Sequence, residues 1–181
     1  MTLTIVQTSD ILSEHITDKG GTIMHSRIFQ ISKEPIKKDD YIEESNYYDH
    51  WFTNSIADYV DGDTDRENDI QWLKDCYADS GLSFGIDDGG EYFIIEDKVK
   101  YFAKRFDVFQ KTLKELQDIT LDDFASGKCG MYMYTLKSTY DDEFGFYIDS
   151  EDTSLETFDS FIRHSGNGAK FYIGATIDYH F

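Results

Sequence analysis

Carboxylates are the most concentrated chemical feature of this sequence. Asp and Glu contribute 36 residues against 17 Lys and Arg, giving a net charge of −19 at pH 7. Crowded carboxylates repel each other and cost stability, so we expect a fold that keeps them to use them for recognition. We predict two partner-binding clusters, with a further acidic run at Asp39, Asp40, Glu43 and Glu44. The first cluster comprises Asp58, Asp61, Asp63, Asp65, Glu67 and Asp69, and the second comprises Asp141, Asp142, Glu143, Asp149, Glu151 and Asp152.

Such clusters could compete with nucleic acid for a basic protein. Duplex DNA presents one negative charge per about 1.7 Å of its axis, and a rigid surface of closely spaced carboxylates could occupy a groove built for phosphates. Aromatic side chains interleaved with the acids could anchor the contact. The same charge disfavours direct binding to duplex DNA or to an anionic membrane. The alternative is a solvated acidic face that has no charged partner.

No catalytic or metal-binding motif accompanies these clusters. The five histidines show no HxxxH or HxH spacing and the two cysteines no CxxC spacing, so we predict no metal site and no cofactor. Asp178 and His180 would share one face of a strand, where an exposed pair is a simpler interpretation than an acid–base pair. We therefore predict that the protein is not an enzyme. A small hydrolase that uses Cys76, Cys129 or His180 is the alternative.

The run from Asp61 to Asp65 begins like a calcium-binding loop, with carboxylates at its first, third and fifth positions. Arg66 stands where the sharp turn of such a loop needs glycine, and Trp72 where it needs a bidentate glutamate. The spacing therefore favours a solvated helix-capping loop.

A long amphipathic helix is expected to organise the fold. Between Lys98 and Gln117, apolar residues recur at spacings of three and four, and we expect its phenylalanines to bury much of the core area. A helix of this length spans about 30 Å. Up to Leu116 the segment carries six Lys and Arg against two acids, so it has a charge of +4 in a chain whose remainder carries −23.

The other elements predict an α+β domain with a mostly antiparallel sheet of five to six strands, built from hairpins and packed on this helix. Asp97 is predicted to cap the long helix, and Thr64 and Thr153 to begin capping boxes. Strands are predicted over residues 27–32, 82–86, 91–95, 129–140, 144–148 and 171–181, and helices over 48–60, 65–79 and from 153 onward.

The chain is predicted to hold a single domain over residues 24–181. Lys19-Gly20-Gly21 can be encoded by a purine-rich ribosome-binding sequence shortly before Met24, so residues 1–23 are interpreted as a non-native or flexible leader. An ordinary Gly-Gly turn is the alternative. The sequence has no apolar run of membrane-spanning length and no secretory signal, and its two cysteines indicate reduced thiols in the cytoplasm.

Two segments, HSRIFQISKEPIKKDDYIEES (His25 to Ser45) and FYIGATIDYHF (Phe171 to Phe181), together with the length and charge, resemble a family. This family is that of the type II anti-CRISPR proteins, which block Cas9 and are carried by phages and mobile elements of gut Firmicutes. The resemblance implies binding to the complex of Cas9 and guide RNA in the bacterial host cytoplasm, with loss of target DNA binding or cleavage. It carries over no functional residue. An anti-restriction or other DNA-mimic protein, and an accessory domain without a charged partner, are the alternatives.

Overall fold

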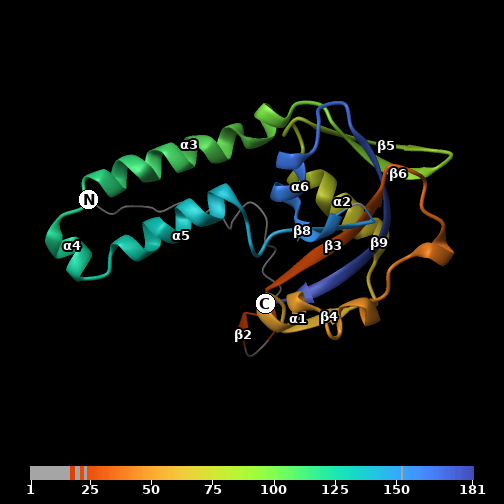
Figure 1. Cartoon of the computed structure of the whole chain (residues 1–181), viewed down its shortest axis with the longest axis horizontal. Coiled ribbons are helices and arrows are strands. Elements are labelled where there is room, and N and C mark those ends of the chain that lie inside the picture. The colour runs from red at the N-terminus through yellow and green to blue at the C-terminus, as the bar shows by residue number, and fades with distance from the viewer. Residues whose placement is uncertain (1–16, 19–20, 23, 152) are drawn as a thin grey trace.

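A seven-stranded sheet forms the centre of the protein (Figure 1), and the predicted α+β class is confirmed. The computed structural model describes residues 17–18, 21–22, 24–151 and 153–181, so most of the predicted leader lies outside the described residues. The strand order is β5-β6-β9-β3-β7-β8, and β4 also pairs with β9. The strands are β3 (His25–Ser32), β4 (Tyr59–Asp61), β5 (Leu82–Asp87), β6 (Gly90–Ile95), β7 (Tyr147–Ser150), β8 (Thr153–Thr157) and β9 (Lys170–His180). A separate short pair comprises β1 (Thr17–Asp18) and β2 (Gly21–Thr22).

Strand β9 ties the sheet together. It pairs antiparallel with β3 along most of its length, with β6 near residue 171 and with β4 near residue 179. Its residues Phe171, Ile173, Ala175, Ile177 and Tyr179 are all buried, as the alternating pattern of the sequence predicts. The sheet has one parallel pair, β3 with β7, which the hairpin-based prediction did not include.

Two hydrophobic clusters lie on opposite faces of β3 and β7. Phe29 and Ile148 belong to the larger cluster, which α2 (Arg66–Cys76) and α6 (Phe158–His164) complete. Ile28 and Tyr147 belong to the smaller cluster, which Phe52 of α1 (Trp51–Ser55) completes. Because neighbouring residues of a strand point to opposite faces, both faces of the sheet centre are covered.

A helical hairpin, here called the helical arm (residues 98–140), extends away from the sheet (Figure 1). It comprises α3 (Lys98–Gln117), α4 (Leu121–Ala125) and α5 (Cys129–Tyr140), and α3 packs along α5. The predicted bounds of α3 and its Asp97 cap are confirmed, with Asp97 accepting hydrogen bonds from the backbone of Val99 and Lys100. The predicted strand over 129–140 is wrong, because this segment is a helix that packs on α3 instead of a strand in the sheet.

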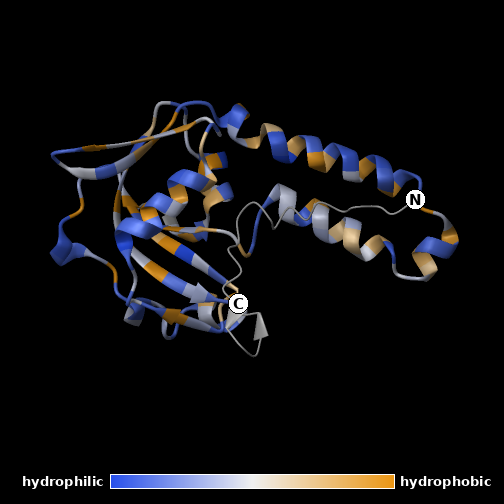
Figure 2. Cartoon of the chain, turned by 180° about the vertical axis from the view of Figure 1, so that it is seen from behind, coloured by the Kyte–Doolittle hydropathy of each residue, from blue (hydrophilic) through white to orange (hydrophobic). Residues whose placement is uncertain are grey.

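The apolar stripe of α3 is used differently from the expectation. Tyr101 in its first turn is buried against the larger core cluster, whereas Val99 and Phe106 are 78% and 58% exposed. Figure 2 shows hydrophobic residues along both long helices of the arm, outside the sheet. The phenylalanines of α3 therefore do not supply much of the core.

The base of the helical arm is clamped onto α6. The buried carboxylate of Asp159 accepts hydrogen bonds from the Tyr101 hydroxyl at 2.8 Å and the Asp142 backbone at 3.0 Å, and it pairs with Arg105. The Arg163 guanidinium lies 4.9 Å and 4.2 Å from the ring centres of Phe102 in α3 and Tyr140 in α5. One short helix therefore holds both long helices of the arm through polar and cation–π contacts.

Smaller differences concern the ends of elements. The predicted helix over 48–60 is α1 alone, followed by strand β4, because Val60 pairs with Tyr179. The predicted helix from Thr153 begins only at Phe158, where the Thr157 side chain accepts from the Ser160 backbone; the preceding residues form β8. The short 3-10 turns η2 (Lys38–Asp40) and η3 (Glu44–Tyr47) precede α1.

Candidate partner-binding surfaces

The first acidic cluster extends from Asp58, just before β4, through the segment that joins β4 to α2 and into the first turn of α2. Asp58, Asp63, Asp65 and Glu67 are exposed. The segment is held at one end by pairing of β4 with β9 and at the other by Asp65, which accepts a hydrogen bond from the Asn68 backbone at 3.2 Å and so caps α2. The predicted cap at Thr64 is therefore wrong by one residue. The carboxylates project from a segment whose backbone is fixed at both ends.

Two members of this cluster have roles inside the fold. Asp61 accepts a hydrogen bond from the Asp63 backbone at 2.8 Å, which closes the turn after β4. Asp69 is only 4% exposed and its Oδ1 lies 2.6 Å from Nε of Arg27. Asp69 is therefore a buried ion-pair partner and is not available to a binding partner.

Most of the second acidic cluster is committed to internal contacts. Asp141 accepts from the Thr157 hydroxyl, Asp149 accepts from the Tyr47 hydroxyl at 2.5 Å, and Glu143 pairs with Lys137 of α5. Glu151 is exposed, and Asp152 lies outside the described residues. The first cluster therefore leaves more carboxylates exposed and without an internal partner than the second does.

Asp142 is the most perturbed acid of the second cluster. Burial raises the pKa of its carboxyl, and the nearby Asp159 carboxylate raises it further, while attraction to the Arg105 guanidinium opposes both effects. Because the net shift is upward, the cost of burial outweighs the attraction of the cation. This carboxylate lies near Arg105 and Asp159 at the base of the arm and does not belong to an external acidic surface.

The third acidic run lies beside the first cluster. The Gln30 side chain of β3 donates to the Asp40 carbonyl at 2.9 Å and accepts from the Ile42 backbone at 3.2 Å, which fastens this loop to the sheet. The Glu44 carboxylate accepts from the Tyr48 hydroxyl and, at 2.8 Å, from the Gly62 backbone. These two hydrogen bonds lower the pKa of Glu44. The bond to Gly62 also joins the third acidic run to the segment of the first cluster.

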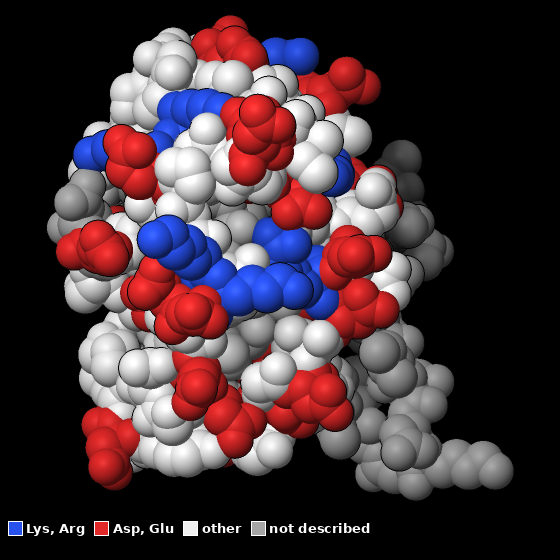
Figure 3. Space-filling view, turned by 90° about the vertical axis from the view of Figure 1, so that its right-hand side faces the viewer, with Lys and Arg blue, Asp and Glu red and all other residues white. Residues whose placement is uncertain are grey.

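The acidic surface is interrupted by cations. A shallow hollow of about 640 Å³ has Lys38 and Arg66 in its wall beside the acids, and is lined by Lys38, Tyr41, Asp63, Thr64, Asp65, Arg66 and Glu67. Figure 3 shows one side of the molecule, where carboxylates surround a band of Lys and Arg. The Arg66 guanidinium is already engaged by Glu91 at 2.9 Å and by the Ile173 carbonyl at 2.8 Å. The charges of the exposed acids are therefore only partly offset.

The helical arm presents apolar side chains that the sequence prediction missed. Leu121 and Phe124 of α4 are 81% and 66% exposed, and Met133 of α5 is 60% exposed. An open hollow at the tip is lined by Leu116, Ile119, Thr120, Leu121, Phe124, Cys129 and Met133. This surface was missed because residues 129–140 were predicted to form a strand of the sheet. The buried or half-buried Tyr132, Leu136 and Thr139, spaced four and three apart, carried the helical signal.

Two further structural findings bear on interpretation. No helix within the described part of the chain combines the length and apolarity needed to span a bilayer. No protein-family model, curated protein or solved structure matches the chain.

Proposed function

We propose that the protein is a non-enzymatic inhibitor that binds the nucleic-acid site of a basic target in the cytoplasm of a bacterial host, with Cas9 bound to guide RNA as the first target. The observation that carries the proposal is the set of exposed carboxylates on Asp58, Asp63 and Glu67. Within the described part of the chain, no lysine or arginine forms an ion pair with any of the three.

Unpaired exposed carboxylates suit a contact with a cationic groove. Their charge repels within the free protein, and the repulsion is relieved when cations of a partner approach. The backbone of Asp58 is bonded to His180 beside β4, Asp63 follows β4, and Glu67 is in the first turn of α2. Their backbone is therefore held by regular structure, so little conformational entropy is lost on binding. Such contacts chiefly accelerate association and weaken as salt is added.

Cas9 supplies a target surface of this kind. It holds the heteroduplex of guide and target in a positively charged channel and reads its adjacent motif with a pair of arginines. An acidic segment that entered the channel or the reading site would exclude DNA by occupying the positions of its phosphates. A restriction enzyme or another DNA-binding protein would present a similar surface, and is the alternative target.

The test is a plasmid-cleavage assay with Cas9, guide RNA and the full chain at two salt concentrations. The test variant carries Asp58→Lys, Asp63→Lys and Glu67→Lys. The control variant carries Asp88→Lys, Asp107→Lys and Asp118→Lys, three exposed acids outside the cluster. Both variants change the net charge from −19 to −13, so they separate the position of the charge from its amount.

We expect the wild type and the control variant to inhibit cleavage, more weakly at the higher salt, and the test variant to lose at least about tenfold in potency. Equal loss in both variants would mean that only overall charge matters. If inhibition is unchanged by added salt and is retained in the test variant, the contact lies on the helical arm instead of the acidic cluster. Absence of inhibition at micromolar protein would exclude Cas9, and the same variants would then be assayed against a restriction endonuclease.

A further inference from the structure

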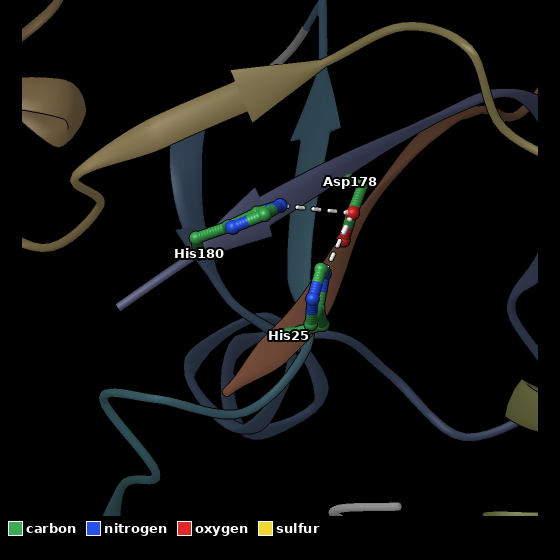
Figure 4. Close-up of side chains that lie close together, drawn as sticks. All are labelled: His25, Asp178 and His180. Carbon is green, nitrogen blue, oxygen red and sulfur yellow. Dashed lines mark hydrogen bonds and ion pairs between the residues drawn. The ribbon is translucent and has the colours of Figure 1, made fainter. Parts of the chain in front are cut away.

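Two histidines and a carboxylate come together where β3 meets the end of β9 (Figure 4). His25 and His180 are directly paired across the two antiparallel strands, and Asp178 is two residues before His180 on the same face. Paired residues of neighbouring strands share a face, and their side chains lie close together. His25 and Asp178 are 153 positions apart in the chain, so spacing along the sequence could not reveal the group.

The two histidines approach the same carboxylate oxygen of Asp178. Oδ2 of Asp178 lies 2.8 Å from Nδ1 of His25 and 3.3 Å from Nε2 of His180. Two ligands of a tetrahedral zinc ion, each about 2.0–2.1 Å from the metal, are about 3.3 Å apart. An ion between these atoms requires the Asp178–His25 pair to open by about half an ångström, and the ligand atoms of all three residues lie within 4.8 Å of one another.

A second layer of side chains holds Asp178 in this orientation. Arg27 bonds the other oxygen of Asp178 through Nη1, and its Nε lies 2.6 Å from Oδ1 of the buried Asp69. Oδ2 of Asp178 is thus left to face the histidines. Partners that fix a ligating carboxylate in this way are typical of metal sites. One Oδ2 atom, that of Asp69, is buried without a hydrogen-bond partner within the described part of the chain.

The local charge also favours a cation. Asp178 and Asp69 together carry one negative charge more than Arg27 neutralises. Asp61 of β4 is paired with Asp178 in the sheet register, on the opposite side from Arg27, and adds a further carboxylate. The side chains of His25, Asp178 and His180 are 25%, 14% and 24% exposed, so an ion can reach the group from solvent.

We propose that His25, Asp178 and His180 bind a divalent transition-metal ion, with Zn²⁺ as the ion that the donor set suits best. Imidazole nitrogens with a carboxylate oxygen are ordinary zinc ligands, and three protein ligands leave at least one coordination position open to water or to a group of a partner. The proposed ligands are different residues from Asp58, Asp63 and Glu67, which carry the proposed inhibition, although β4 lies beside both groups.

The test is titration of the full, metal-stripped chain with ZnCl₂ by calorimetry. The test variants are His25→Gln and His180→Gln. The control is His164→Gln, which removes a histidine that also lies near a carboxylate, Glu156 at 3.9 Å, but whose side chain is 74% exposed at the end of α6. We expect one site in the wild type and in the control, and a Kd weakened by at least about tenfold in either test variant. Circular dichroism of each variant checks its fold.

The proposal is overturned if the wild type shows no single zinc site, or if both test variants bind as tightly as the control. Should a test variant unfold, the decision moves to the wild type alone, titrated with Co²⁺ and followed by the ring-proton resonances of its histidines. Strong paramagnetic shifts of His25 and His180, without comparable shifts of His164, support the site. Unshifted resonances of His25 and His180 refute it.

Discussion

Asp159 is the residue whose loss should most affect the attachment of the helical arm. Its carboxylate is 2% exposed and satisfies three donors, from Tyr101, Arg105 and the Asp142 backbone. Burial is the largest single influence and lowers the pKa of the Arg105 guanidinium. The attraction and hydrogen bond to Asp159, together with the nearby Tyr101 and Tyr77, outweigh it, and the net shift is upward. The substitution Asp159→Asn keeps the shape of the side chain and removes its charge, so Arg105 loses its counter-ion.

The magnitude follows from the burial of the pair. Removing one partner of a buried ion pair costs about 3–5 kcal/mol, because the other charge stays buried and unpaired. The Arg105 side chain is 19% exposed and the asparagine keeps one acceptor oxygen, so we expect the lower end of that range, about 3 kcal/mol. The matched control is Glu143→Gln, which breaks the more exposed pair with Lys137 and should cost about 1 kcal/mol or less.

The assay is urea unfolding at pH 7 followed by circular dichroism, with both variants compared with the wild type. A second substitution tests the same ion pair further. In the Asp159→Asn background, Asp142 is the remaining carboxylate near Arg105, so adding Asp142→Asn should destabilise further. A cost for Asp159→Asn close to that of Glu143→Gln would refute the reasoning, because the buried pair would then behave as an exposed one.

Three further outcomes are expected. In the otherwise wild-type chain, Asp142→Asn should stabilise the protein at neutral pH. Burial raises the pKa of the Asp142 carboxyl in the folded state, so its ionisation costs stability once the pH exceeds the ordinary pKa of an aspartate. The gain in melting temperature of the variant over the wild type should therefore disappear below about pH 4 in a pH series. Gly174→Ala should cost about 1–3 kcal/mol in urea unfolding, because the added Cβ would lie 2.5 Å from Oε1 of Gln30. It would displace the Gln30 side chain, which holds the third acidic run through Asp40 and Ile42. Leu121→Lys at the exposed tip of the arm should change stability by less than about 0.5 kcal/mol by the same measurement; a larger loss would place that leucine in a contact within the protein.

The sequence predicted elements whose signals are local and strong. The bounds of α3, its Asp97 cap and the alternation of β9 each follow from local signals, and the structure confirms them. The strand prediction for residues 129–140 was wrong because Met and Tyr alternate there and favour a strand by propensity. In the structure this segment is α5, which packs along α3, and such tertiary effects override local preference.

The acidic clusters show the same limit for sites. Exposed acids such as Asp63 and buried ones such as Asp69 have the same appearance in a sequence. Only the position of Arg27, which lies on a distant strand, separates them. The group formed by His25 and Asp178 could not be predicted from spacing, because the register of β3 against β9 creates it.

The position of β9 has a consequence for biosynthesis. This strand lies between β3 and β6 in the sheet, so the strand made early, β3, waits for a partner that leaves the ribosome more than a hundred residues later. The helical arm consists of contacts between neighbouring helices and can form while translation continues, whereas the sheet closes only after residue 180 has emerged. Loop closure over such distances is slow, and the nascent chain must keep the apolar residues of β3 from aggregating until then.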